Sequence, residues 1–411
     1  LSILAYPVSG TPFVEQHATF FSIIGFYCIF YGLNSKKKIY WLLTVFLFGF
    51  AFLSKQVPSA YLATSGIIIV IYNFLVIKDK HNYKIIFYVF SYSIFFLVLL
   101  FLFFIKSGID YKDFINQYIL YPMSFGVERL GKYEIDLNNF FFQFKFIYLF
   151  FIPYSILNLI QLLKDREYYK SKNFNLFLLS LAILSCMIFH QIHTKNQVYI
   201  YFMIPIIAGF LHINLKSIQI KSKKFFYYFF IAIIVILTVK YHYRFNIERK
   251  FHELNYINFN HALNGNKLDK KFEGLKWITP KSTSKDKNLE ELNDILNLKR
   301  ALTDDKRNKM LISNYSFFSI LLKENLHAPN RWYPLDGSAF PIKKSDYYNY
   351  YKLFFINIIK RNKIEVIYMS NEINLKTLNY YLDKKCFQTL ESNKSYKSYS
   401  INKNCKQLNF F

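Results

Sequence analysis

Glycine and proline are scarce in this sequence, with 12 and 10 residues among 411. Dinucleotide-binding loops of the G-x-G-x-x-G type and P-loops both need glycine, because their backbone amides approach a phosphate closely. Neither motif occurs in full. The sequence therefore does not predict a nucleotide-binding site of either kind.

Cysteine is also rare, and neither a C-x-x-C nor an H-E-x-x-H motif is present. His190 and His193 are three residues apart and can share one face of a helix, but no third ligand accompanies them. No cofactor is expected, and a divalent metal is not indicated. Cys28 and Cys186 fall in apolar segments, where cysteine acts as a small packing residue.

Acidic residues number only 26 against 52 Lys and Arg, and residues 1–240 contain nine of the 26. This shift in composition places a domain boundary near Lys240 and predicts one domain over 1–240 and another over 241–411. The net charge of +26 suggests nucleic-acid binding at first sight. However, half of it lies in loops between apolar segments and the rest forms no dense cluster, so a nucleic-acid partner is not expected.

Long apolar segments without a charged residue dominate the first domain. A helix needs about 20 residues to cross the roughly 30 Å of hydrocarbon in a bilayer. Buried helices of a soluble protein are the alternative, but one small polar domain could not cover so many uncharged segments. We therefore expect a multi-pass α-helical membrane domain of about eight spans, some of them using polar flanks. The segments are Ala18–Leu33, Ile39–Leu53, Val57–Ile77, Ile85–Ile105, Phe146–Leu163, Leu176–Phe189, Val198–Leu211 and Phe225–Val239.

Basic residues are concentrated in alternate loops, near Lys37, Lys80, Lys170 and Lys223. The positive-inside rule places these loops in the cytoplasm. Residues 1–17, the 54–56 turn, the 106–145 loop, the 190–197 loop and the second domain then share the outer side. Within the 106–145 loop, Tyr111–Pro122 has helical apolar spacing and predicts either an interfacial helix or a lid packed on the bundle.

Shorter apolar segments alternate with polar ones after Lys240. This alternation predicts a small extracytoplasmic α/β domain. Cys386 and Cys405 lie near its end, where they either form a disulfide in an oxidising compartment or remain free buried thiols. The expected strands are Leu275–Thr279, Met310–Ser313, Glu365–Met369 and Phe387–Leu390, and the expected helices are Leu289–Arg300, Tyr315–Lys323, Asp346–Arg361 and Leu375–Lys384.

Polar residues gather at the outer ends of the apolar segments, which themselves contain no charge. Ion-coupled transporters place ionisable groups at mid-membrane depth, so this pattern favours chemistry at the lipid–water boundary. Cations there suit the phosphate of a lipid-linked sugar, and a carboxylate suits proton abstraction from an acceptor. The candidate catalytic residues are Glu15 and His17. The candidates for binding the donor phosphate are Lys55, Gln56, Arg129, His190, His193, Lys195, Asn196 and Gln197.

Simpler roles remain open for the same residues. Lys55 can anchor a helix end by extending its amine to the interface. His190 and His193 can be interfacial polar residues, and Glu15 can be an ordinary solvated loop acid.

In the segments around these residues the chain resembles the GT-C superfamily of polyprenyl-phosphate-sugar-dependent glycosyltransferases, which includes protein mannosyltransferases and lipid A aminoarabinose transferases. The resemblance covers most of residues 1–240 and extends to the layout of many spans followed by an extracytoplasmic α/β domain. The segments that carry it are Ser9–His17 (S-G-T-P-F-V-E-Q-H), Gly49–Gln56 (G-F-A-F-L-S-K-Q) and Thr194–Pro205 (T-K-N-Q-V-Y-I-Y-F-M-I-P).

The resemblance implies sugar transfer, with inversion, from a polyprenyl-phosphate donor to a lipid, glycan or protein acceptor at the periplasmic face of a bacterial inner membrane. The principal catalytic Asp of the superfamily lies in its first outer loop. Since this chain starts at Leu1, we expect that loop to precede it and Glu15 to match a second acidic position. The alternative is a non-enzymatic membrane protein of the same layout, either a lipid-linked sugar transporter or an envelope scaffold.

Overall fold

The computed structural model divides the chain into two compact units, residues 1–252 (unit 1) and 253–411 (unit 2). Each unit is described by itself. The residues that the structure describes are 14–35, 37–77, 81–123, 136–194, 200–217, 223–244, 254, 257–315, 317–329, 340–341, 343–402 and 404–405.

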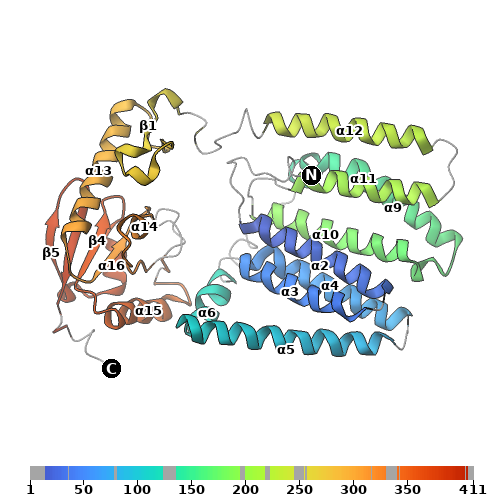
Figure 1. Cartoon of the computed structure of the whole chain (residues 1–411), viewed down its shortest axis with the longest axis horizontal. Coiled ribbons are helices and arrows are strands. Elements are labelled where there is room, and N and C mark those ends of the chain that lie inside the picture. Colours follow the sequence, from blue (N-terminus) through green and yellow to red (C-terminus); the bar gives the residue numbers. More distant parts are fainter. Residues whose placement is uncertain are drawn as a thin grey trace. The chain divides into compact units, whose positions relative to one another are not determined.

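Unit 1 is a bundle of long helices that lie side by side (Figure 1). Six of its helices are long and apolar enough to cross a membrane, and two apolar helices, Lys38–Ser54 and Ile200–Lys216, are shorter. Each apolar segment found in the sequence overlaps one of these eight helices in the described part of the chain. The principal helices are α2 (Val14–Ser35), α3 (Lys38–Ser54), α4 (Gln56–Tyr72), α5 (His81–Ser107), α9 (Lys145–Lys164), α10 (Lys172–Thr194), α11 (Met203–Ser217) and α12 (Lys223–Tyr243).

Glycine allows close packing between the first helices of unit 1. A Cβ atom on Gly32 of α2 would come within 2.8 Å of the ring of Trp41, and one on Gly49 of α3 would clash with the ring of Phe96 of α5. Trp41 is fully buried as a result, with 1% of its surface exposed. Small residues at helix contacts are typical of membrane bundles, where association depends on close van der Waals packing.

The segment after α5 folds back onto the bundle. It comprises α6 (Tyr111–Phe114) and the π-helix η2 (Ile115–Leu120). The Tyr118 hydroxyl donates to the carbonyls of Phe52 and Leu53 at 2.8 and 2.6 Å, and Phe114 contacts Phe104 of α5. This segment therefore packs against the end of α3, a contact that fits both the interfacial helix and the lid expected for Tyr111–Pro122.

Unit 2 is built on a four-stranded sheet in the order β3-β4-β6-β5 (Figure 1). Strands β3 (Lys309–Ile312) and β4 (Val366–Ser370) are parallel, whereas β4 pairs with β6 (Tyr396–Ile401) and β6 with β5 (Phe387–Ser392) in antiparallel fashion. A second sheet pairs β1 (Leu263–Asn264) with β2 (Lys276–Trp277).

Helices cover both faces of the larger sheet. Alternate residues of β4 enter two cores: Val366 and Tyr368 pack with α13 (Lys285–Asp304), and Ile367 and Met369 pack with α15 (Tyr348–Arg361) and α16 (Leu375–Tyr381). Burial on both faces explains the continuous apolar sequence of this strand. The short helix α14 (Phe318–Leu322) packs on the α13 side.

The four expected strands and four expected helices of the second domain all overlap observed elements. Two strands were not expected: β1, which has only two residues, and β6, which lies in the interior of the sheet. The sequence of β6, Y-K-S-Y-S-I, alternates serine and lysine with tyrosine and lacks an apolar run. Tyr396, Tyr399 and Ile401 supply its buried apolar surface instead.

Candidate functional site

Four helix ends meet at one end of the unit 1 bundle. Successive helices run in opposite directions, so the start of α2, the end of α3, the start of α4 and the end of α10 lie together. Helix α4 contacts α2, α3 and α10. Between α3 and α4 the chain leaves the helical conformation at Lys55, with φ −155° and ψ 129°, and again at Val57, with φ −118° and ψ 127°.

Glu15 and Lys55, which are 40 positions apart in sequence, form an ion pair at this end. The Lys55 Nζ and Glu15 Oε1 atoms are 3.2 Å apart, and the two side chains are 22% and 14% exposed. Glu15 lies in the first turn of α2, where the helix dipole stabilises a negatively charged side chain. The structure thus brings together the acid and one of the cations selected from sequence.

Gln56 and the histidines of α10 belong to the same end of the bundle. The Gln56 side-chain amide donates to the carbonyl of Tyr118 and so ties α4 to η2. His190 lies close enough to Lys55 and His193 to interact with both electrostatically. His190 and His193 are buried, and the His193 ring stacks on Phe189 at 5.8 Å between ring centroids.

His17 is placed differently. Its side chain is exposed, and residues two apart on a helix point to different sides. The structure therefore does not bring His17 to the Glu15–Lys55 pair. Arg129, Lys195, Asn196 and Gln197, the other residues predicted from sequence, lie outside the described residues.

Polar contacts also occur at the opposite end of the bundle. The Tyr168 hydroxyl donates to Asn158 at 2.7 Å, and the Gln161 amide donates to Asn214 at 3.1 Å. Asn158 and Asn214 are buried. Because uncharged amides break a hydropathy pattern very little, sequence reasoning missed these contacts.

Sequence reasoning also missed a cavity of about 380 Å³ in unit 2. It lies at the carboxyl end of the parallel strands β3 and β4, where open α/β sheets commonly hold ligands. The only sequence signal was a group of acidic residues on α13, which resembles any solvated helix face. The lining residues are Lys281, Thr283, Lys287, Glu290, Glu291, Asp294, Ile295, Leu298, Tyr315, Ser370, Asn371, Glu372, Lys394 and Ser395.

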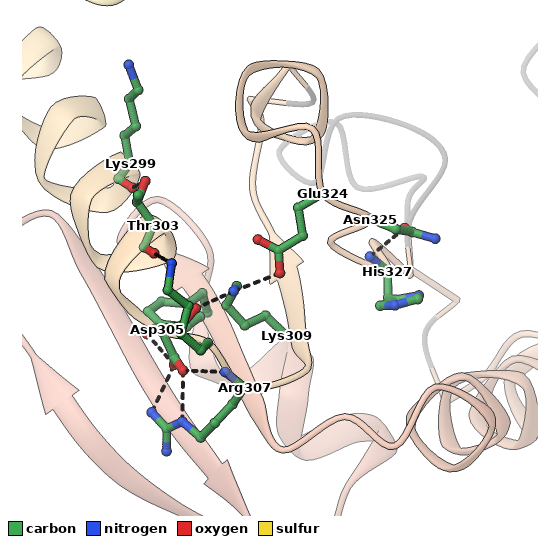
Figure 2. Close-up of polar contacts among 10 residues, drawn as sticks. Lys299, Thr303, Asp305, Arg307, Lys309, Glu324, Asn325 and His327 are labelled. Atoms are coloured by element: carbon green, nitrogen blue, oxygen red, sulfur yellow. Dashed lines mark hydrogen bonds and ion pairs between the residues drawn. The ribbon is translucent and has the colours of Figure 1, made fainter.

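A polar cluster at the amino end of β3, opposite to the cavity, stabilises the fold instead (Figure 2). Lys309 is 2% exposed, and its amine reaches Glu324 at 2.7 Å and the carbonyl of Asp305 at 2.5 Å. Both Asp305 oxygens accept from the Arg307 guanidinium at 2.9 Å. Since each charge already has a partner, this cluster offers no open site.

Among the described residues, no group of three or more His, Cys, Asp or Glu side chains is arranged to hold a metal ion. Comparison of the chain with protein-family models, characterised proteins and solved structures finds no match. The function is therefore inferred from the geometry of the described residues.

Proposed function

We propose that unit 1 binds a polyprenyl-phosphate sugar and transfers the sugar to an acceptor at the outer face of a bacterial inner membrane. The contact between Glu15 and Lys55 is the observation that carries this proposal. It puts a carboxylate beside an ammonium group at the end of an apolar bundle, and these are the two groups that proton abstraction and phosphate binding would need. A lipid-linked donor carries its phosphate at this level of the bilayer.

In the proposed step, an acceptor hydroxyl oxygen attacks the anomeric carbon. The bond from that carbon to the phosphate oxygen breaks, and the phosphate leaves with the electron pair. Lys55 neutralises the leaving phosphate, and Glu15 takes the proton of the hydroxyl. Because the donor phosphate competes with Glu15 for Lys55, donor binding frees the carboxylate for this role. Attack opposite the leaving group inverts the anomeric carbon.

Binding of undecaprenyl phosphate to the full chain in lipid nanodiscs tests the cation. Loss of a charged hydrogen bond costs about 1.5–3 kcal/mol, so Lys55→Ala is expected to weaken binding roughly 10- to 150-fold. Undecaprenol, which lacks the phosphate, should bind the parent chain and Lys55→Ala equally. Lys38→Ala removes the same charge from the other end of α3 and serves as the matched control. Equal affinity of Lys55→Ala and the parent chain would contradict the proposal.

Sugar transfer from a panel of polyprenyl-phosphate hexoses tests the acid. Glu15→Gln is expected to lower the turnover number more than the affinity for the donor. The exposed Glu167, at the opposite end of the bundle, provides the control variant Glu167→Gln. Unchanged turnover in Glu15→Gln would remove the proposed role of the carboxylate.

Transport of a lipid-linked sugar is the second candidate. The buried contacts of Asn158 and Asn214 at the opposite end favour it, because a transport path requires polar groups at both ends. A proteoliposome assay distinguishes the candidates: a transporter moves labelled lipid-linked sugar between leaflets without breaking its phosphate bond.

A further inference from the structure

We propose that the unit 2 cavity binds a small ligand that carries an ammonium group, with Glu291 and Asp294 as its acceptors. This inference is independent of the transfer chemistry proposed for unit 1. It concerns other residues, in a unit with its own core.

Glu291 is the central observation. Its side chain is buried, at 7% exposure, and it lines the cavity. Two neutral hydroxyls hold it: Thr279 donates to Oε2 at 2.5 Å and Tyr315 donates to Oε1 at 2.6 Å. The pKa of Tyr315 is raised, chiefly by burial and secondly by its hydrogen bond to Glu291. Its hydroxyl therefore keeps its proton.

A buried carboxylate is costly unless a cation or several donors compensate for it. Glu291 forms no ion pair among the residues that the structure describes, and each of its oxygens can accept a further hydrogen bond. An ammonium group in the cavity would supply both the charge and the N–H donors.

Asp294 extends the same acidic wall one helical turn further along α13. Its Oδ1 accepts from Ser395 at 2.7 Å, which orients the carboxylate at the β5–β6 turn. Glu290, which is exposed, also lines the cavity. Glu372 across the cavity is already paired with Lys281 and accepts from Asn314 at 2.5 Å.

Ser370 provides an independent sign of a ligand. It is the last residue of β4, and strand alternation places it with Val366 and Tyr368 on the α13 face. Its side chain is 4% exposed, and its Oγ has no hydrogen-bond partner among the described residues. Buried hydroxyls are normally satisfied, so a ligand hydroxyl or amine is the missing partner.

Other ligand classes fit less well. A phosphate or carboxylate would face Glu291 and Asp294 across the cavity and be repelled. Lys287 and Lys394 line the cavity, but both are exposed and screened by water. The buried floor is formed by Ile295 and Leu298, which suit the carbon skeleton of the ligand.

Calorimetric titration of the full chain in phosphatidylcholine nanodiscs tests the proposal. The probes are ethanolamine and glucosamine, each compared with its N-acetyl form, which has the same skeleton without the charge. We expect millimolar or tighter binding of at least one amine. Acetylation should weaken that binding by at least about tenfold, since charged hydrogen bonds are the stronger ones. Equal binding of the acetylated forms, or no binding of either amine, overturns the proposal.

Variants locate the binding. Glu291→Gln and Asp294→Asn should each weaken amine binding about tenfold, whereas Asp304→Asn, an exposed acid on the same helix, should leave it unchanged. Asp294→Asn can keep the hydrogen bond from Ser395, so it decides the matter if Glu291→Gln fails to fold. Binding that is unaffected by the folded cavity variants contradicts the assigned site.

A second titration identifies the source of the amine. In nanodiscs that contain phosphatidylethanolamine, reduced binding of free ethanolamine assigns the site to a lipid headgroup. Unchanged binding assigns it to a free amine, and both results uphold an ammonium site.

Discussion

In unit 2, burial opposes the ionisation of Asp305, whereas its hydrogen-bond partners favour it. Its side chain is 8% exposed. Burial opposes its ionisation, but the Arg307 side chain and amide and the Tyr368 hydroxyl outweigh this effect and lower the pKa of Asp305 to about 2. The carboxylate therefore stays ionised in the folded state well below the pH at which it would be protonated in an unfolded chain.

Asp305 should make the stability of unit 2 depend on pH in the acidic range. A depressed folded-state pKa contributes stability above the unfolded value of about 3.9 that is lost as pH falls toward 2. We expect a contribution of about 1–2 kcal/mol, since the half-exposed Arg307 is screened by solvent. Hydrogen exchange of the β3 amides between pH 5 and pH 2 measures it.

The variant Asp305→Asn should lose this pH dependence and be less protected at pH 5. Asp304→Asn, one position earlier and exposed, is the control. An identical pH profile for Asp305→Asn and the parent chain would show that the carboxylate does not act this way.

At the scale of elements, the β5–β6 hairpin is closed by a disulfide. Cys386 immediately precedes β5 and Cys405 follows β6, and their Cα atoms are 5.0 Å apart. The amide of Asn402 donates to the carbonyl of Cys386 at 2.8 Å, so backbone contacts hold the same two segments. Both cysteines are buried.

Removal of this disulfide should destabilise unit 2. For a separation of 19 residues, the chain-entropy treatment predicts a loss of roughly 3 kcal/mol. Pulse proteolysis in urea should place the unfolding midpoint of unit 2 lower in Cys386→Ser/Cys405→Ser. The variant Cys28→Ser/Cys186→Ser, which changes the two free cysteines of unit 1, is the control. Equal midpoints for unit 2 in the disulfide variant and the parent chain would refute this role.

At the scale of the whole molecule, helix direction and the distribution of charge predict one orientation in the membrane. The basic residues Lys38, Lys170 and Lys172 stand at the bundle end opposite to Glu15 and Lys55. Positive charge marks the cytoplasmic side. Because unit 2 follows the end of α12, which lies at the Glu15 end of the bundle, we expect unit 2 outside the cytoplasm.

Reporter fusions test this orientation. An alkaline phosphatase or fluorescent-protein fusion after Lys170 should report the cytoplasm, and one after Asn288 should report the opposite side. A fusion after Lys216, expected in the cytoplasm, is the internal control. The same side for Lys170 and Asn288 would remove the basis for an outer active site.

Composition and hydropathy were enough to locate the apolar helices and most elements of unit 2. Uncharged segments of this length have no other stable place than a bilayer or a protein interior, so their pattern survives folding unchanged. Strand β6 and the start of β3 escaped prediction. In β6, buried tyrosine rings lie beside serines. Strand β3 begins at Lys309, whose charge is compensated by Glu324, 15 positions later in the chain.

Contacts between distant residues were decided by the tertiary structure. Glu15 and Lys55 were both selected from sequence, but only the packing of α2 against α3 and α4 places them 3.2 Å apart. The same packing leaves His17 exposed, since helical geometry separates it from Glu15. The cavity around Glu291 had only the acidic residues of α13 as a sequence signal, and these resemble any solvated helix face. It arises where a helix, two strand ends and a hairpin turn meet, and such a meeting depends on the register of the whole sheet.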